Sequence, residues 1–173
     1  MMFQQFYVGQ LDVSRLNYGI FTLLPKVVEA TRIQQFRPIC LLICIYKWIT
    51  KVLTIRIEPY MKKLTNKCQN AFIKGRNIMD GVLSLHEILH DTKQRKQTGI
   101  ILKLDFEKVY DKVNWDFLFQ CIDLRGFSPL WKQWLRQVVC NGTLSVKLND
   151  QTSSYFTSHK GVRQGNPLSP FFL

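Results

Sequence analysis

Apolar residues recur at helical spacing in two stretches of the first hundred residues. In the first, residues 45–57, the face opposite the apolar stripe is polar and Pro59 follows; that face consists of Lys47, Thr50, Lys51 and Thr54. We predict an amphipathic helix there with a basic outer face, ending before the proline. A second helix is predicted from about Ile78 to Lys96, with basic residues in its last turn and a glycine beyond. The apolar stripe of the first helix consists of Ile45, Trp48, Ile49, Val52 and Leu53.

The second half of the chain alternates short apolar runs with helix and turn signals. Residues 100–106 (IILKLDF) predict a buried strand that carries Asp105 near its end. Asn114 is positioned to cap a helix that runs to about Leu124, and Ser128-Pro129 opens another. The runs at 143–149 and 153–159 surround Asn149-Asp150 and predict a hairpin. With no repeat or linker, these signals indicate one mixed unit of the α+β class.

Composition adds a core and a strong positive charge to this pattern. The chain has 173 residues, of which 46% are hydrophobic, enough to bury a core in one domain. Lys and Arg number 24 against 12 Asp and Glu, a net charge of +12 spread along the chain. A polyanionic partner is expected, with nucleic acid ahead of an acidic membrane surface.

The cysteines and the chain start indicate an intracellular protein. The five cysteines form no CxxC pair, so neither a disulfide framework nor a thiolate zinc site is suggested. The N-terminal residues do not form a signal peptide, and the longest apolar run, ICLLICIY, is far shorter than the roughly 18 residues of a membrane span. We expect no membrane association.

One short motif suggests a different chemistry. His86-Glu87-Ile88-Leu89-His90 fits the His-Glu-x-x-His pattern of zinc hydrolases, in which the histidines hold the metal and the glutamate activates water. Such a site needs a third protein ligand downstream, and the only later histidine is His159. We therefore expect no zinc, and the zinc hydrolase is kept as an alternative function.

Four blocks, in order, resemble one known family. They are LNYGIFTLLPK with FRPICLL, QNAFIKGRNI, LKLDFEKVYDKVNW and GVRQGNPLSP, and they extend from about residue 16 to 170. Together they resemble the reverse transcriptases of plant non-LTR retrotransposons of the long interspersed class. The resemblance implies a partial right-hand polymerase within residues 1–173, with fingers at about 16–98 and the start of an incomplete palm sheet at about 99–173. The chain is expected to be truncated before the second carboxylate motif, aromatic-x-Asp-Asp.

The resemblance assigns catalytic and nucleotide-binding roles. Asp105 resembles the first catalytic metal ligand for Mg²⁺ or Mn²⁺, with the Phe106 carbonyl as a further oxygen. Tyr110 matches the aromatic residue under the incoming sugar, although taken singly it suits a core position equally well. Arg37 resembles the residue that pairs with the triphosphate, where a planar guanidinium is chemically suited, and Lys26 is a weaker candidate. A surface ion pair is the alternative for Arg37.

The remaining assignments concern the template. Gln164 and Gly165 match positions that contact nucleotide and template in the family, although Gly-Asn-Pro is also a common turn sequence. Three basic residues are expected on the template backbone, contacting phosphates without sequence preference: Lys74, Arg76 and Arg163. The implied partners are an RNA template, a DNA primer and dNTP, with a nuclear location for action on genomic DNA; oligomeric state is left open.

Departures from the family pattern concern activity. Asn166 stands where the family usually has Asp, Val109 where it has Ala, and Ile43 where it has Asn. One carboxylate does not hold two metals, so this chain alone is expected to be inactive. A nucleic-acid-binding remnant without catalysis is the main alternative.

Overall fold

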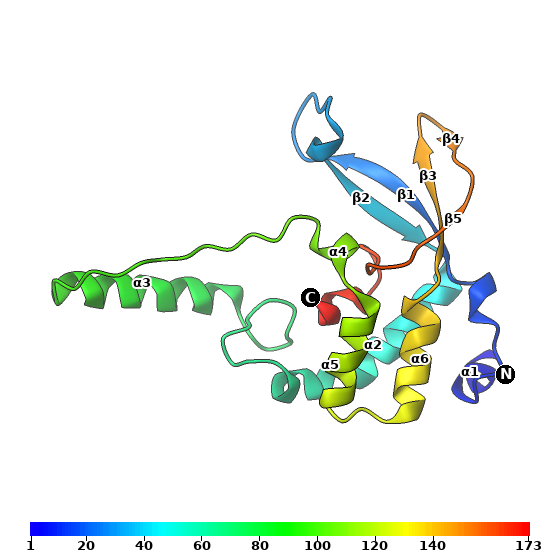
Figure 1. The fold of residues 1–173 in the computed structure, drawn as a ribbon, viewed down its shortest axis with the longest axis horizontal. Helices are drawn as coiled ribbons and strands as arrows, with labels where there is room; N and C mark the ends of the chain where they lie inside the picture. Colours follow the sequence, from blue (N-terminus) through cyan, green and yellow to red (C-terminus); the bar gives the residue numbers. More distant parts are fainter. The chain divides into compact units, whose positions relative to one another are not determined.

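The computed structural model describes residues 1–173, which form two compact units. Unit 1 contains Met1–Thr54 and Lys108–Leu173, and unit 2 contains Ile55–Glu107. The sequence suggested a single unit, whereas the chain leaves unit 1 within a helix and returns to it more than fifty residues later. The elements labelled in Figure 1 are α1 (Met2–Tyr7), β1 (Tyr18–Pro25), β2 (Phe36–Leu42), α2 (Cys44–Leu64), α3 (Ile78–Gln94), α4 (Val109–Lys112), α5 (Trp115–Leu124), α6 (Pro129–Val139), β3 (Thr143–Leu148), β4 (Gln151–Thr152) and β5 (Phe156–Thr157). Short 3₁₀ turns are formed by Val13–Arg15, Ile33–Gln35 and Ser169–Phe172.

Unit 1 is built around a mixed sheet of five strands in the order β2-β1-β3-β4, with β5 also paired to β3. β1 and β2 are antiparallel, from Gly19 opposite Leu42 to Pro25 opposite Phe36, while β3 runs parallel to β1. β2 is therefore an edge strand. An edge position tolerates Pro38, which lacks the N–H group that an inner strand would need. The result is a mixed α+β fold with a partial sheet.

The predicted hairpin around Asn149-Asp150 is confirmed, although the strand that follows the turn is β4, which lies before the predicted run 153–159, and only Phe156–Thr157 of that run forms a strand. β3 pairs antiparallel with β4, and Leu148 lies opposite Gln151. Asn149 and Asp150 have φ of 49° and 62°, which are the left-handed conformations that a tight two-residue hairpin turn requires. Asparagine and aspartate tolerate these angles better than most residues, so the local sequence sets this turn.

The two predicted helices after residue 114 are also confirmed. The Asn114 side chain accepts a hydrogen bond from Phe117 N at 3.0 Å at the start of α5, and the Ser128 hydroxyl accepts one from Trp131 N at 3.3 Å at the start of α6. Between them, Gly126 has φ of +73°. The side chains that α6 buries are Trp134, Leu135 and Val138.

The predicted end of the first helix at Pro59 is wrong. α2 continues through this proline to Leu64. A proline costs a helix one hydrogen bond and some strain. Ile57 and Met61, on either side of it, are both buried, so continuation of the helix keeps two apolar side chains out of water.

The predicted buried face of this helix is only partly correct. Ile49 and Leu53 are buried, but Trp48 is 61% exposed, and Thr50 and Thr54 are buried instead. The threonine hydroxyls donate to backbone carbonyls of their own helix, Thr50 to Tyr46 at 3.2 Å and Thr54 to Thr50 at 2.8 Å. Because these hydroxyls find partners within the helix, threonines are tolerated in the core.

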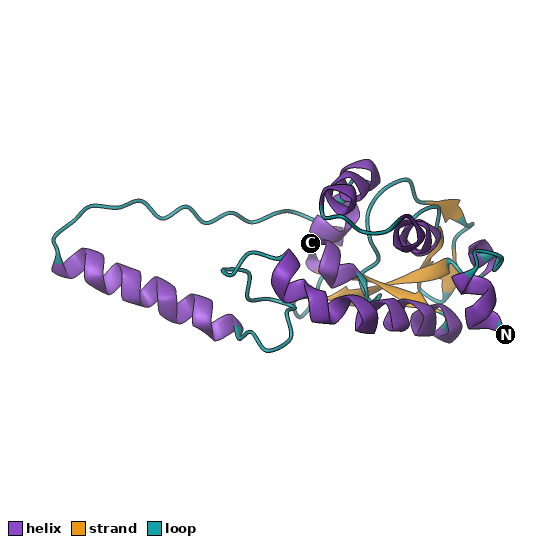
Figure 2. Cartoon of the chain, turned by 90° about the horizontal axis from the view of Figure 1, so that it is seen from below, coloured by secondary structure: helices purple, strands orange, loops and turns teal.

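In unit 2, α3 confirms the predicted helix, but the predicted strand after it is wrong. Asn77 caps α3 by accepting a hydrogen bond from Met79 N at 3.0 Å, and no residue of α3 is buried. Residues 100–106 are irregular and exposed, drawn as loop in Figure 2, with Ile100 at 98% and Leu102 at 77% exposure. An apolar run becomes a strand only if a neighbouring strand takes its backbone hydrogen bonds, and no strand pairs with this segment.

No helix in the structure is both long enough and apolar enough to cross a membrane.

Candidate functional site

The segment 161–165, which contains the predicted Gln164-Gly165 contact, is tied by its backbone to α4. Gly161 N donates to the Val113 carbonyl and Val162 N to the Tyr110 carbonyl, both at 2.7 Å. The Trp115 indole N–H donates to the Gly161 carbonyl, also at 2.7 Å. The block that carries Tyr110 and the block that carries Gln164 are therefore joined in unit 1.

The same segment then meets the edge strand β2. Cys40 N donates to the Gln164 carbonyl at 2.9 Å. Gly165 has φ of +109°, and a Cβ atom added to it would lie 2.9 Å from the Cys40 carbonyl oxygen. A residue with a side chain would be strained there and would also collide with the strand. Close contact between the loop and β2 therefore requires glycine at position 165.

Both predicted triphosphate-binding residues lie in unit 1. Arg37 is on β2, opposite Leu24, and is exposed. Lys26 is exposed directly after β1, and its ammonium group donates to the Gln34 carbonyl at 3.0 Å. Unit 1 therefore contains every residue predicted for the nucleotide, while their individual roles stay predictions.

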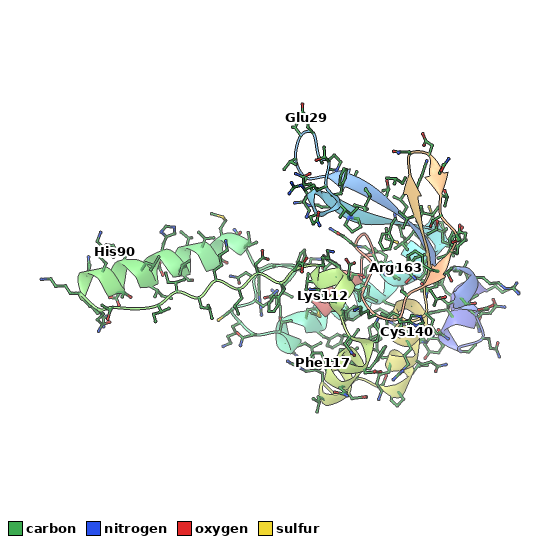
Figure 3. The ribbon with its side chains drawn as sticks, turned by 45° about the horizontal axis from the view of Figure 1, so that its top comes forward. Glu29, His90, Lys112, Phe117, Cys140 and Arg163 are labelled. Atoms are coloured by element: carbon green, nitrogen blue, oxygen red, sulfur yellow. The ribbon has the colours of Figure 1, made fainter.

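Arg163 is buried, which differs from the expected template contact. Only 8% of it is exposed, and its Nη2 donates to the Asn17 carbonyl at 3.2 Å. The guanidinium carbon lies 5.2 Å from the centre of the Tyr46 ring. Figure 3 marks Arg163 in unit 1. The structure directs this side chain toward the interior, and the sequence contained no signal that Asn17 and Tyr46 would receive it.

Burial also perturbs two neutral groups beside this arginine. It raises the pKa of Tyr46 to about 12, against the opposite effect of the Arg163 guanidinium. It likewise raises the pKa of the Cys40 thiol to about 11, again opposed by Arg163. Both pKa values lie further above neutral pH than usual, because burial costs the anionic form more solvation free energy than the nearby Arg163 charge restores.

Asn166, one of the departures from the family pattern, has a local structural role. It is buried, and its side-chain oxygen accepts a hydrogen bond from Leu168 N at 3.0 Å. The Asn166 carbonyl accepts another from Ser169 N at 3.2 Å. A neutral amide performs this turn-forming role without burying a charge.

Asp105, the predicted metal ligand, is in unit 2 and is exposed within the irregular segment, as is Phe106. The structure contains no group of three or more His, Cys, Asp or Glu side chains that could hold a metal ion. One carboxylate in an irregular segment does not supply the ligands of a two-metal site.

The two predicted template contacts of unit 2 differ in their surroundings. Arg76 closes the loop after α2, because its Nη1 donates to the Asn66 and Gln69 carbonyls, each at 2.6 Å, and its Nη2 to the Lys62 carbonyl at 3.3 Å. The Lys74 side chain is 79% exposed, and its ammonium lies 3.9 Å from Glu58. Lys74 is accessible to a polyanion, whereas Arg76 is largely occupied by backbone carbonyls.

The histidines of the His-Glu-x-x-His motif lie exposed on α3. The Nε2 atom of His90 is 3.4 Å from the Gln94 amide nitrogen one helical turn away. The expectation about zinc stays a prediction.

These observations define a mixed α+β protein in which a glutamine-glycine loop is fixed between a short helix and the edge strand of a partial sheet. Residues 25–173 match the family described as reverse transcriptase (RNA-dependent DNA polymerase). The chain belongs to the reverse transcriptase family. Members of this family generally depend on divalent metal ions and use an RNA template and nucleotide substrates.

Relatives of known origin support this assignment. The chain is 28% identical over 166 residues to the uncharacterized 149 kDa protein of transposon TX1 from Xenopus laevis, covering 96% of this chain and 13% of that protein. It is 24% identical over 168 residues to the retrovirus-related Pol polyprotein of the type-2 retrotransposable element R2DM from Drosophila melanogaster, covering 96% and 16%. The polyprotein of the type-1 element R2 from Popillia japonica is 20% identical over 153 residues, covering 88% and 21%. The chain thus spans a small part of each relative.

Proposed function

We propose that this chain is part of the reverse transcriptase of a non-LTR retrotransposon of the plant type, and that the whole protein copies RNA into DNA. The observation that carries the proposal is the docking of Gln164-Gly165 onto β2, inside the region matched to the family. Support also comes from the retrotransposable elements named among the relatives. In the proposed reaction, a primer 3′-hydroxyl gives up its proton to solvent and attacks the α-phosphate of a dNTP opposite an RNA template, and the bond between the α- and β-phosphates breaks to release pyrophosphate.

Unit 1 would bind the nucleotide. The Arg37 guanidinium would pair with the triphosphate, since a planar fork matches phosphate oxygens, and Lys26 would add a second positive charge. Tyr110 would lie under the sugar, and Gln164-Gly165 would contact the nucleotide and the template. Their backbone links to β2 and α4 support this role, because fixed groups lose little freedom on binding.

Asp105, with the Phe106 carbonyl, is the proposed ligand of a catalytic Mg²⁺ or Mn²⁺ ion. Because one carboxylate is insufficient for two metals, we expect the chain alone not to polymerise. Lys74 is proposed to contact template phosphates. We propose the fingers at about 16–98, the start of the palm at about 99–173, and a nuclear site of action.

Nucleic-acid binding without catalysis is the second candidate function for the chain as it stands. The net charge of +12 and the exposed position of Asp105 in an irregular segment favour it. Such binding would be made to phosphates and would weaken as salt rises. It differs from the first candidate only in the absence of nucleotide incorporation.

A polymerase assay of two proteins tests the first candidate. One is the chain itself, and the other is the chain extended by the reading frame that follows the Leu173 codon. With primed RNA, dNTP and Mg²⁺ or Mn²⁺, we expect incorporation only by the extended protein, abolished by Asp105→Asn. Asp91→Asn is the matched control, since Asp91 is an exposed carboxylate on α3 that pairs with Arg95.

Two results would contradict the proposal. An extended protein that contains an aromatic-x-Asp-Asp sequence and binds primed RNA, yet incorporates no nucleotide, would exclude the polymerase function. Incorporation by the chain alone that Asp105→Asn abolishes would show that a second carboxylate motif is unnecessary.

A further inference from the structure

Arg163 is the only charged side chain buried in this protein, with 8% of it exposed. No acidic side chain pairs with it, and its Nη1 atom is buried without a hydrogen-bond partner. A buried guanidinium without a counter-charge is unfavourable unless other contacts compensate. The contacts that it does make therefore indicate its role.

The first contact joins Arg163 to a junction of three elements. Its Nη2 donates to the Asn17 carbonyl at 3.2 Å, and the same carbonyl accepts Thr143 N, at the start of β3, at 3.0 Å. The Asn17 side chain donates to the carbonyls of Cys140 at 2.9 Å and Gln137 at 3.3 Å, at the end of α6. Arg163 is thus attached where β1 begins, α6 ends and β3 begins.

The second set of contacts fixes the orientation of the guanidinium. A Cβ atom added to Gly142 would lie 1.4 Å from Nη2, so the guanidinium occupies the space that a side chain at 142 would fill. The guanidinium carbon lies over the Tyr46 ring, 5.2 Å from its centre and within the range of a cation–π interaction. The hydroxyl of Tyr46 donates to the Val138 carbonyl, which holds the ring in place.

The residues that directly follow Arg163 are the ones docked on β2. The Gln164 carbonyl accepts Cys40 N at 2.9 Å, and Gly165 is in close contact with the Cys40 carbonyl. β2 is an edge strand, so this N–H would otherwise lack a strand partner. The single hydrogen bond between Cys40 N and the Gln164 carbonyl stabilises this contact only slightly. Because the preceding residue, Arg163, is already fixed in the interior, the loop loses less conformational entropy when it docks on β2.

We propose that Arg163 is a positioning residue that holds Gln164 and Gly165 against the edge of β2, the strand that carries Arg37. The functional part of this inference rests on the proposed function, because it assumes that Gln164 and Gly165 contact the nucleotide. The structural part does not. Arg163 acts through its neighbours and does not itself contact a template phosphate.

Site-resolved amide hydrogen exchange tests the structural part in the full chain. In Arg163→Met we expect the Cys40 amide to exchange at least about tenfold faster, because the loop is released from β2. The Thr143 amide donates to the same Asn17 carbonyl. Its exchange rate should rise only by the factor that the lower global stability of the variant predicts. Arg163→Lys should give an intermediate Cys40 rate, since one ammonium still reaches a carbonyl but lacks the planar fork. Lys160→Met removes an exposed charge three residues away and should leave Cys40 unchanged.

Unchanged Cys40 exchange in Arg163→Met would overturn the inference. Equal acceleration of the Cys40 and Thr143 amides would also overturn it, since that result indicates a contribution to global stability only. If Arg163→Met does not fold, Arg163→Lys decides the question, and a wild-type Cys40 rate in that variant refutes the positioning role.

A salt titration of single-stranded RNA binding separates positioning from phosphate contact. We expect the same slope of log affinity against log salt in wild type and Arg163→Met. A slope smaller by about 0.7 in the variant would identify Arg163 as a phosphate contact and overturn the inference. No RNA binding by the folded wild-type chain would refute the proposed template binding, while the exchange experiment would still decide the role of Arg163.

Discussion

Substitution of Tyr46 by phenylalanine tests the core of unit 1 and its dependence on pH. Tyr46 is fully buried and its hydroxyl donates to the Val138 carbonyl. Tyr46→Phe leaves that buried carbonyl without its partner, which should lower the free energy of unfolding by about 1–3 kcal/mol at neutral pH.

The same substitution removes an ionisable group whose pKa burial raises to about 12. An unfolded tyrosine has a pKa of about 10, so the folded state holds this proton more tightly. The resulting stabilisation is complete below about pH 10 and is lost as pH rises toward 12. At about pH 11 the unfolded state gains a factor of about 10 from ionisation, or about 1.4 kcal/mol. Tyr46→Phe has no ionisable group at this position. The difference in free energy of unfolding between wild type and variant should therefore be smaller at pH 11 than at neutral pH by about 1.4 kcal/mol.

Urea unfolding followed by tryptophan fluorescence, between pH 7 and 11 under reducing conditions, measures both effects. All four tryptophans, Trp48, Trp115, Trp131 and Trp134, lie in unit 1, so the signal reports on that unit. Tyr155→Phe is the control, because Tyr155 is 56% exposed and also belongs to unit 1. A difference between wild type and Tyr46→Phe that stays constant up to pH 11 would refute the reasoning about the buried hydroxyl.

Three further predictions concern the loop, the template contact and the histidine motif. Gly165→Ala should lower the free energy of unfolding by about 1–3 kcal/mol in the same urea assay, because φ of +109° and the Cys40 carbonyl both oppose a Cβ atom; an unchanged midpoint would contradict the close contact. Lys74→Met should reduce the salt slope of RNA binding by about 0.7, measured by fluorescence anisotropy, and an unchanged slope would remove Lys74 from the template path. Metal analysis of the purified chain should give no stoichiometric zinc; one zinc per chain, lost in His86→Ala, would support the hydrolase instead.

Local chemistry made several elements predictable from sequence. Asn114 and Ser128 cap their helices as expected, because a cap needs only one side-chain oxygen and the backbone N–H groups that follow it. The Asn149-Asp150 hairpin also depends on residues adjacent in sequence. The family blocks were likewise readable, since they are defined by residue order alone.

Features that depend on distant partners were not predictable in this way. Residues 100–106 have the composition of a strand, yet a strand requires a neighbour that the pattern does not reveal. The buried face of α2 includes Thr50 and Thr54, although the hydrophobic pattern places them on the exposed side. Their burial is tolerated because each hydroxyl donates to a backbone carbonyl of the same helix.

The candidate site divides in the same way. The sequence by itself determined which residue types are present, including the glutamine-glycine pair and the arginine before it, together with the family to which they belong. Only the tertiary structure decided that Gln164 docks on β2 and that Arg163 points inward, to a carbonyl 146 residues away in the chain. The sequence around an arginine does not show whether its guanidinium binds a phosphate or a buried carbonyl, because the partner comes from a distant part of the chain. Its environment is set by the packing of β1, α2, α6 and β3, which no local pattern encodes.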